Sequence, residues 1–325
     1  MATDRITLGA AALPEPERTW LAAAEDLPLD SVGQGGHVLP PSPTGEAITR
    51  LALMTAWTER LRVGSAVLVL PLYHPVVVAK QLADLDTRSG GRLTVGVGVG
   101  GDFADEFAAV GVPVRERGPR TDEAMDVMRA LWSGRPVTHH GRFVDLDGVD
   151  MRPVVDPGGA VGRPGGPPLL VSGRKEPAMR RAARRGDGWM PYLFSPSAYA
   201  RSVATIRGEA ESAGRDLDRD GFEWMLYLYC SIRPDGDRAR DDVASFLGSA
   251  YGDKPGAMLD RIAPAGTPDE VAAKLQPYVD AGARHIVISP AAHTDTFEVV
   301  RLAATEVLPQ LRVPPAPRGP GTVQR

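Results

Sequence analysis

The stretch from Arg62 to Gly101 places the tightest constraint on the fold, because it has the pattern of strand, loop, helix, turn and strand in one unbroken unit. Arg62–Leu70 is almost wholly apolar, as is typical of a parallel strand that is covered on both faces. The helix after it ends in Ser89-Gly90-Gly91, and a second apolar strand follows at Leu93–Val97. The two strands therefore run in the same direction.

The same rhythm of strand and helix extends along most of the 325 residues. Eight units of this kind favour closure into a (β/α)8 TIM barrel over an open sheet. We expect one barrel domain over residues 1–313, interrupted by inserts at about 134–166 and 248–264, and a disordered Pro/Gly-rich tail over 314–325. The predicted strands are Ile6–Ala11, Asp30–Gly33, Arg62–Leu70, Arg92–Val97, Pro168–Val171, Gly188–Pro191, Phe222–Ile232 and His285–Ser289.

The segments between these strands carry periodic apolar faces, and several open with Ser, Thr, Pro or Asp. The predicted helices are Glu15–Glu25, Thr44–Trp57, His74–Leu85, Arg117–Trp132, Glu176–Arg185, Pro196–Ala213, Pro268–Ala281 and Asp295–Leu308. The first insert predicts a hairpin around Gly141, and either insert could cover the barrel mouth as a lid.

Charge and composition exclude several classes of partner. The net charge of −4, from 37 basic and 41 acidic residues, gives no basic surface for nucleic acid or a membrane. The chain has neither the pattern of a signal peptide nor an apolar run of about 20 residues, so we expect a cytoplasmic protein. The single cysteine, Cys230, lies in an apolar run and is interpreted as a buried packing residue. The six histidines show no metal-ligand spacing, so no metal is expected.

Glycines follow the fourth predicted strand, where Gly96, Gly98 and Gly101 formally match the dinucleotide-binding pattern. A Rossmann unit would continue into another parallel strand that ends in an acidic residue, whereas here a long helix follows. We expect these glycines to let a flat ligand approach the backbone at the carboxyl end of the strand. Close packing at a strand end is the alternative.

The run Val171–Lys175 ends the fifth strand and leads straight into a helix. Free backbone N–H groups, the helix dipole, Ser172, Gly173 and the cationic Arg174 could there converge on a phosphate. The segment Gly186–Trp189, with Asp187 and Trp189, could form the other wall. The alternative for Arg174 is a solvated surface charge.

His37 follows Gly35-Gly36 just beyond the second strand. At a barrel mouth, an imidazole there could exchange a hydrogen bond or a proton with a substrate. A capping or packing histidine in a proline-rich loop is the alternative.

With these residues in view, the chain resembles the luciferase-like flavin and deazaflavin oxidoreductases from about Ile6 to Leu311. The motifs that carry the resemblance are VGSAVLVLPLYHPVVVAKQLADLD, SGGRLTVGVGVGGDFADEF, GVPVRERGPRTDEAMDVMRALW, THHGRFVDLDGV and RAARRGDGWMP. The resemblance implies a (β/α)8 barrel, a cis peptide bond at Ala66-Val67 behind a tricyclic ring, a cofactor phosphate near the fifth and sixth strands, and a role for His37. The cofactor-binding residues it implies, with those expected above, are Ser65, Ala66, Val67, Gly98, Gly100, Ser172, Gly173, Arg174, Asp187 and Trp189.

The chain departs from this family at three places. Many relatives have a Trp in the second strand and an acidic residue just before the histidine, whereas this chain has Gly33 and Gly36. We therefore expect an open pocket floor and no carboxylate to orient His37. A phosphate-binding arginine of the luciferase subunit is replaced by Val99, and a glutamate of the sugar-phosphate dehydrogenases is replaced by Gly101.

Three functions follow as hypotheses. The leading one is a monooxygenase that receives reduced FMN from a separate reductase and transfers an oxygen atom to a small organic substrate. The second is hydride transfer with the deazaflavin coenzyme F-420, and the third is a non-catalytic flavin-binding partner subunit. Similar proteins often dimerise through barrel helices, so a homodimer is one assembly that the resemblance allows.

Overall fold

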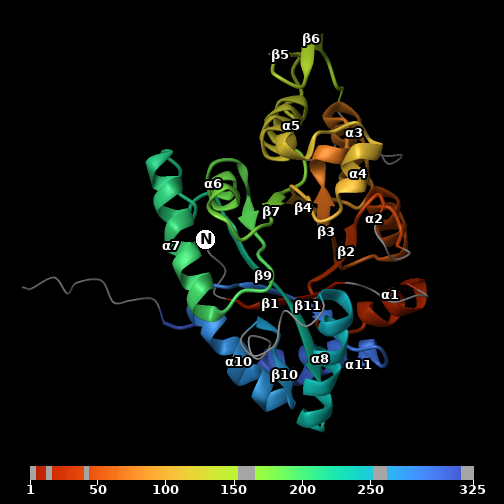
Figure 1. Cartoon of the computed structure of the whole chain (residues 1–325), viewed down its shortest axis with the longest axis vertical. Coiled ribbons are helices and arrows are strands. Elements are labelled where there is room, and N and C mark those ends of the chain that lie inside the picture. The colour runs from red at the N-terminus through yellow and green to blue at the C-terminus, as the bar shows by residue number, and fades with distance from the viewer. Residues whose placement is uncertain (1–4, 12–16, 40–43, 153–164, 252–261, 316–325) are drawn as a thin grey trace, which may run out of the picture.

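The computed structural model describes residues 5–11, 17–39, 44–152, 165–251 and 262–315 of the chain. Eight parallel strands form a closed barrel with helices around it (Figure 1), as predicted. Closure is direct, since Thr7 pairs with His285 on one side and Gly188 pairs with Glu223 on the other. In barrel order the strands are β1 (Thr7–Ala11), β2 (Ser31–Gly36), β3 (Arg62–Val69), β4 (Leu93–Gly98), β7 (Leu169–Val171), β8 (Gly188–Trp189), β9 (Glu223–Ile232) and β11 (His285–Pro290). A short strand, β10 (Ala265–Gly266), pairs with the end of β9.

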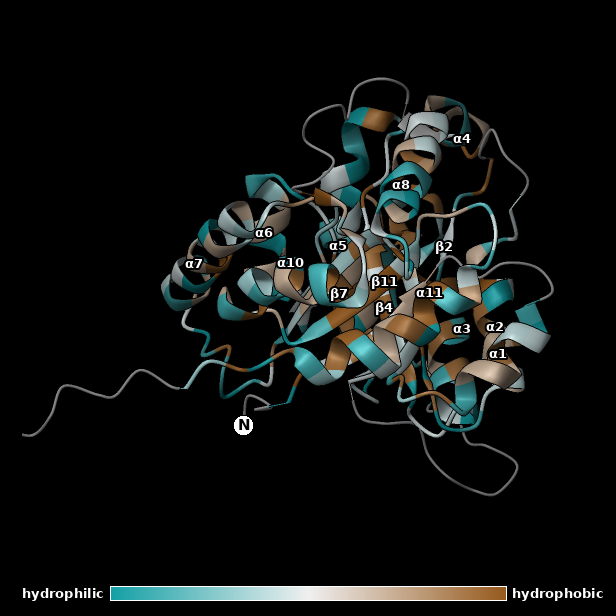
Figure 2. Ribbon diagram, turned by 90° about the horizontal axis from the view of Figure 1, so that it is seen from below, coloured by the Kyte–Doolittle hydropathy of each residue, from teal (hydrophilic) through white to brown (hydrophobic). Residues whose placement is uncertain are grey.

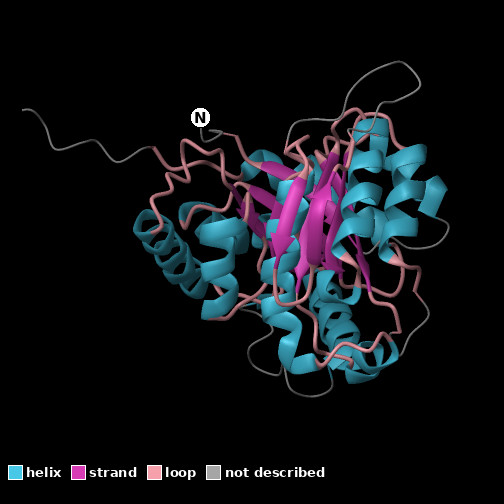
Figure 3. Cartoon of the chain, turned by 90° about the horizontal axis from the view of Figure 1, so that it is seen from above, coloured by secondary structure: helices cyan, strands magenta, loops and turns pink. Residues whose placement is uncertain are grey.

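Helices surround this sheet on its outer side (Figure 3). They are α1 (Glu17–Glu25), α2 (Ala47–Trp57), α3 (Pro75–Arg88), α4 (Ala104–Ala109), α5 (Arg117–Leu131), α6 (Glu176–Arg185), α7 (Pro196–Ser212), α8 (Gly236–Tyr251), α10 (Pro268–Asp280) and α11 (Thr296–Leu302). A π-helical turn (Ala303–Val307) and a 3-10 turn (Leu308–Gln310) continue α11, and two further 3-10 turns are Leu70–Leu72 and Val114–Glu116. All eight predicted helices are present, whereas α4 and α8 were not predicted. None of the helices in the described residues is long and apolar enough to cross a membrane.

Local sequence explains where several helices begin. Thr267 and Glu270 form a reciprocal capping box at the start of α10, with Pro268 in its first turn. Ser195 accepts a hydrogen bond from Ala198 N at the start of α7. These caps satisfy backbone N–H groups that a helix cannot satisfy itself.

The first insert contains the predicted hairpin, with β5 (Val137–His140) and β6 (Asp145–Val149) antiparallel. The hairpin lies at one end of the molecule beside α5 (Figure 1). Residues 153–164 and 252–261 lie outside the described residues, as does most of the tail, so the lids and the disordered tail stay predictions.

Hydrophobic residues are concentrated on the strands and on parts of the surrounding helices (Figure 2). Alternation along the strands separates two layers. On β11, Ile286 and Ile288 belong to the large core between barrel and helices, whereas Val287 packs inside the barrel with Leu170 and Met225. The barrel interior is therefore a separate, smaller cluster.

Candidate functional site

The carboxyl ends of the barrel strands bring most of the predicted site residues to one end of the molecule. In barrels of this architecture, that end carries the functional loops. His37 follows β2, and Ala66 and Val67 lie in β3. Gly98 ends β4, with Gly100 just beyond it, and Ser172, Gly173 and Arg174 follow β7.

The peptide bond between Ala66 and Val67 is cis, as the resemblance implied. The register of β3 against β4 shifts between Ser65 and Leu68, so the strand bulges here. A Cβ atom built on Gly98 would lie 2.6 Å from Cγ2 of Val67, so the Val67 side chain rests on β4 where only glycine leaves room. The buried Ser65 hydroxyl donates to the Gly96 carbonyl at 2.9 Å and is therefore used within the sheet.

Small residues of the first four strands form one side of the barrel interior. This small-residue floor consists of Ala11, Gly33, Ala66, Gly96 and Gly98. A Cβ atom built on Gly33 would face the Cβ atoms of Ala66 and Ala11 at 3.6 and 3.9 Å. The other side carries larger side chains, Leu170, Met190, Met225 and Tyr227. The interior is thus asymmetric, with small residues on one side and larger side chains on the other.

His37 pairs with Glu106, a residue of α4 that the sequence analysis did not identify. The His37 Nδ1 atom lies 3.1 Å from Glu106 Oε1, and Val38 N donates to Oε2 at 3.2 Å. The carboxylate is fully buried, whereas the imidazole is 30% exposed. Since an ionised carboxylate only accepts, Nδ1 is the donor in this contact, and Nε2 is the ring nitrogen that does not face Glu106. The expectation that no carboxylate orients His37 was wrong, because the acidic residue comes from after β4 and not from β2.

Phe103 fixes the imidazole from a second direction. Its ring meets the His37 ring edge-on, with 4.7 Å between centroids. Phe103, just before α4, thus supplies packing and Glu106, within α4, supplies the charge that hold the histidine.

A second acidic contact lies nearby between Tyr73 and Glu46. The Tyr73 hydroxyl donates to Glu46 Oε1 at 2.6 Å. Burial, this bond and the charges of Glu46 and Glu106 raise the pKa of Tyr73 far above its usual value. Burial would raise the pKa of Glu46, but the bonds from Tyr73, Ile48 N and Thr49 N outweigh it, and the pKa is lowered. Tyr73 therefore stays a proton donor to an ionised Glu46.

The end of β7 presents a backbone turn followed by cationic side chains. Gly173 has a φ of +137°, a conformation that favours glycine. The Arg174 guanidinium lies over the Tyr192 ring, 5.0 Å from its centroid. α6 begins directly afterwards, and its capping residue Lys175 makes no side-chain bond to the helix. The free N–H groups at the start of α6 and the guanidinium of Arg174 therefore lie next to each other in the chain, directly after β7.

Asp187 and Trp189 do not lie with the other predicted residues. Asp187 precedes β8, at the opposite end of the barrel, where its carboxylate pairs with Arg129 and accepts from Leu169 N. Trp189 is fully buried outside the barrel against Tyr199, and its Nε1 donates to the Gly173 carbonyl at 3.0 Å. Trp189 supports the turn after β7 from behind, and Asp187 joins β8 to α5.

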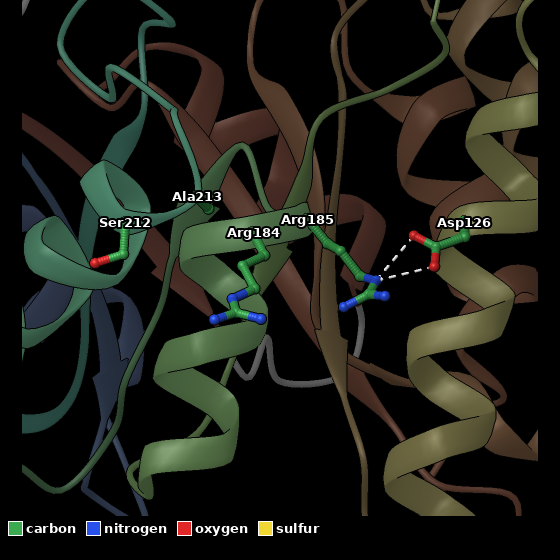
Figure 4. A pocket seen from close by; sticks show the side chains of 5 residues that line it. All are labelled: Asp126, Arg184, Arg185, Ser212 and Ala213. Carbon is green, nitrogen blue, oxygen red and sulfur yellow. Dashed lines mark hydrogen bonds and ion pairs between the residues drawn. The ribbon is translucent and has the colours of Figure 1, made fainter.

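A pocket of about 370 Å³ lies away from this end, between α5, α6 and α7 (Figure 4). Its two arginines are already paired, Arg185 with Asp126 at 2.8 Å and Arg184 with Glu209 at 3.1 Å. These are surface ion pairs, so this pocket is not the candidate site. Among the described residues, no group of three His, Cys, Asp or Glu side chains is placed to hold a metal ion.

Comparison with known proteins shows the family to which the chain belongs. A family model described as luciferase-like monooxygenase matches residues 14–285. A deazaflavin (coenzyme F-420)-dependent glucose-6-phosphate dehydrogenase of Beutenbergia cavernae is 30% identical over 92% of this chain and 94% of its own length. Uncharacterised proteins of Mycobacterium tuberculosis and Mycobacterium bovis are 36% identical over 55% of this chain, and the alignment spans 62% of their length.

Two solved structures share the fold. A deazaflavin-dependent secondary alcohol dehydrogenase, in complex with a coenzyme–acetone adduct, superimposes with a TM-score of 0.81 at 22% identity and covers 95% of this chain and 99% of its own. The monooxygenase RslO1 from Streptomyces bottropensis superimposes with a TM-score of 0.76 at 27% identity and covers 94% and 99%.

Proposed function

Because the chain belongs to the luciferase-like monooxygenase family, we propose that it is an oxidoreductase that binds the deazaflavin coenzyme F-420 and interconverts a small secondary alcohol and its ketone. The observation that carries this proposal is the His37–Glu106 pair. A histidine whose Nδ1 proton is held by a fully buried carboxylate is a prepared proton acceptor.

The small-residue floor and the turn after β7 fit a flat ring with a phosphate. Ala66, Val67 and Gly98 would lie against the ring, where larger side chains on β4 would strike Val67. Ser172, Gly173 and Arg174 would hold the phosphate at the start of α6. Gly100 has a φ of +60° and packs close to Phe107, so we assign it to the shape of the loop rather than to a contact through a side chain.

When bound, the deazaflavin supplies a two-electron acceptor for the hydride of the carbinol carbon. The protein's task is to remove the other hydrogen as a proton. His37 Nε2 accepts the proton of the alcohol hydroxyl while the carbon–oxygen double bond forms. Glu106 then stabilises the imidazolium through Nδ1, as the orienting carboxylate of a catalytic triad does. The reverse reaction returns the proton to the ketone oxygen.

A monooxygenase that uses reduced FMN from a separate reductase is the second candidate. The 27% identity with RslO1 over nearly the whole chain favours it. In that version His37 would hydrogen-bond the substrate, and the same floor would hold the flavin ring. The hypothesis of a non-catalytic subunit was based on the expected lack of a carboxylate beside His37. Glu106 is that carboxylate, so this reason for the hypothesis no longer holds.

Anaerobic titration and turnover test the first proposal against the second. We expect oxidised coenzyme F-420 to bind and to lose its fluorescence when a secondary alcohol is added. His37→Asn should lower kcat at least 100-fold and Glu106→Gln about 10- to 100-fold, both with coenzyme binding unchanged, since each removes proton transfer and not the floor. His140→Asn, on the exposed hairpin, is the matched control and should have no effect. Binding of FMN alone, followed by oxygen consumption, would contradict the proposal.

A further inference from the structure

Four aromatic rings run from the barrel interior to its rim on the side opposite the floor. The aromatic ladder, as we name it, consists of Tyr227, Tyr229, Phe246 and His293. Successive ring centroids lie 5.8, 5.9 and 5.9 Å apart. Tyr227 begins the ladder inside the barrel, in the cluster that contains Ala66 and Val67. The exposed His293 ends it, with Nε2 3.2 Å from Ser245 Oγ.

The ladder comes from three elements that meet at the mouth. β9 supplies the two tyrosines, α8 supplies Phe246, and the loop after β11 supplies His293. The first three rings are half-buried. A row of aromatic rings of this kind suits a flat or apolar ligand, since aromatic rings pack well against one another and carry no fixed charge.

Ser289 places one hydroxyl beside this ladder. It lies directly across from Tyr229 in the register of β11 and β9, on the same inward face as Val287. The side chain is 0% exposed, and its Oγ has no hydrogen-bond partner among the described residues. Burying a hydroxyl without a hydrogen-bond partner is unfavourable, and a ligand with a polar group would supply the missing bond.

We propose that the ladder and Ser289 bind the substrate, and that the substrate is an uncharged aryl alcohol or ketone with a second hydrogen-bonding group that pairs with Ser289 Oγ. This inference rests on the proposed function for the reacting end of the substrate. β1 separates β11 from β2, so Ser289 lies about 10 Å from the strand that precedes His37. A substituted benzene ring spans such a gap, with its reacting carbon at His37 and its second polar group at Ser289.

Apart from Arg174, which the proposed function assigns to the coenzyme phosphate, the cations beside β9 favour an uncharged ligand over a phosphate ester. The cation nearest in sequence to the end of β9, Arg233, is buried and already bound by Asp242 at 2.8 Å and by the Thr294 carbonyl at 2.9 Å. Lys274 donates to the Ala265 carbonyl at 2.8 Å. Both cations are therefore committed to holding β9, β10 and β11 together.

The test measures ligand binding by calorimetry to protein saturated with oxidised coenzyme F-420, with three probes. We expect para-hydroxyacetophenone to bind at least 10-fold more tightly than acetophenone, and glucose 6-phosphate to show no binding. Ser289→Ala should remove that preference and leave acetophenone within twofold. Phe246→Leu should weaken both ketones several-fold. Ser202→Ala, a buried serine on α7, is the matched control and should change neither affinity.

The outcomes separate this inference from the proposed function. Binding of glucose 6-phosphate but of neither ketone would overturn the inference and leave deazaflavin-dependent hydride transfer standing. A Ser289-dependent preference in a protein that oxidises no alcohol would support the inference and overturn the proposed function. An unchanged preference in a folded Ser289→Ala protein would overturn the role of the hydroxyl, and thermal unfolding of each variant checks the fold.

Discussion

His285 titrates in a closed environment at the amino end of the barrel interior. Its ring bridges the Thr7 hydroxyl at 2.6 Å and the Ser31 hydroxyl at 2.7 Å. Burial, and next the positive charge of Arg62, lower the pKa of His285 from 6.5 to about 3. The folded protein therefore holds His285 as a neutral imidazole at every pH well above 3.

This shift predicts a loss of stability in acid. Between pH 6.5 and about 3, His285 binds a proton in the unfolded chain but not in the folded chain. The free energy of unfolding therefore decreases as the pH falls through this range. At pH 5 the loss from this group is about 2 kcal/mol. Urea unfolding gives the free energy of unfolding at pH 7 and at pH 5. In His285→Gln, the difference between these two free energies should be about 2 kcal/mol smaller than in the unsubstituted protein. His140→Gln, at an exposed histidine, should leave this difference unchanged. The same pH dependence in the unsubstituted protein and both variants would contradict the role of His285.

At the residue scale, a sequence identifies a candidate site residue more readily than the residue that forms a hydrogen bond with it. His37 was predicted because it follows a strand, but Glu106 lies 69 positions later and is brought to it only by the adjacency of β2, β3 and β4. Ser289 ends a predicted strand, yet nothing in its neighbours shows that its hydroxyl is unpartnered. Such pairings depend on side-chain directions in three dimensions, which no local pattern contains.

One carboxylate of α5, Glu123, makes several of the contacts that hold the hairpin of β5 and β6 to this helix. Glu123 accepts hydrogen bonds from Phe143 N at 2.9 Å and Val144 N at 2.8 Å, and it faces His139 at 3.4 Å. Burial would raise the pKa of Glu123, but these bonds outweigh it and lower the pKa.

We therefore expect Glu123→Ala to loosen the hairpin without unfolding the barrel. Loss of hydrogen bonds to a charged acceptor should cost about 2 kcal/mol locally, so the Phe143 and Val144 amides should exchange about 30-fold faster. Hydrogen exchange measured by NMR checks this. Asp126→Asn, on the same helix but bonded to Arg185, should leave these amides unchanged. Protection that survives in Glu123→Ala would show that packing alone holds the hairpin.

At the element scale, the prediction failed where helices are short or highly charged. α4 has only six residues and no side-chain cap. α8 begins with Gly-Asp-Arg-Ala-Arg-Asp-Asp, and its buried face has one residue per turn, Ala239, Val243 and Leu247. So narrow an apolar stripe is a weak periodic signal. The element that supplies Phe246 to the ladder was therefore not predicted.

Ligand binding should stabilise the whole barrel, because the floor and the phosphate turn come from different strands. At 100 times its dissociation constant, the coenzyme should add about 2.7 kcal/mol, or roughly 4 °C in Tm. We expect coenzyme F-420 to raise Tm more than FMN at equal concentration. Arg174→Ala should reduce the rise, whereas Arg184→Ala, at the other end of α6, should not. A larger rise with FMN would favour the monooxygenase.

The architecture as a whole was predictable because every unit repeats the same physical pattern. Apolar runs such as His285–Ser289 alternate with amphipathic helices, and eight of them leave no strand edge unpaired when they close. The cis bond at Ala66-Val67 came from resemblance and not from propensity, since no local rule favours it there.

The asymmetry of the barrel interior has a consequence for how such an enzyme can diversify. The small-residue floor and His37 are encoded before residue 99, whereas the ladder and Ser289 are encoded after residue 226. On the proposals above, substitutions at the ladder and Ser289 would change which molecule is accepted while leaving His37, Glu106 and the floor as they are. A change of substrate would then need only a few positions in the last third of the chain, with the coenzyme held constant.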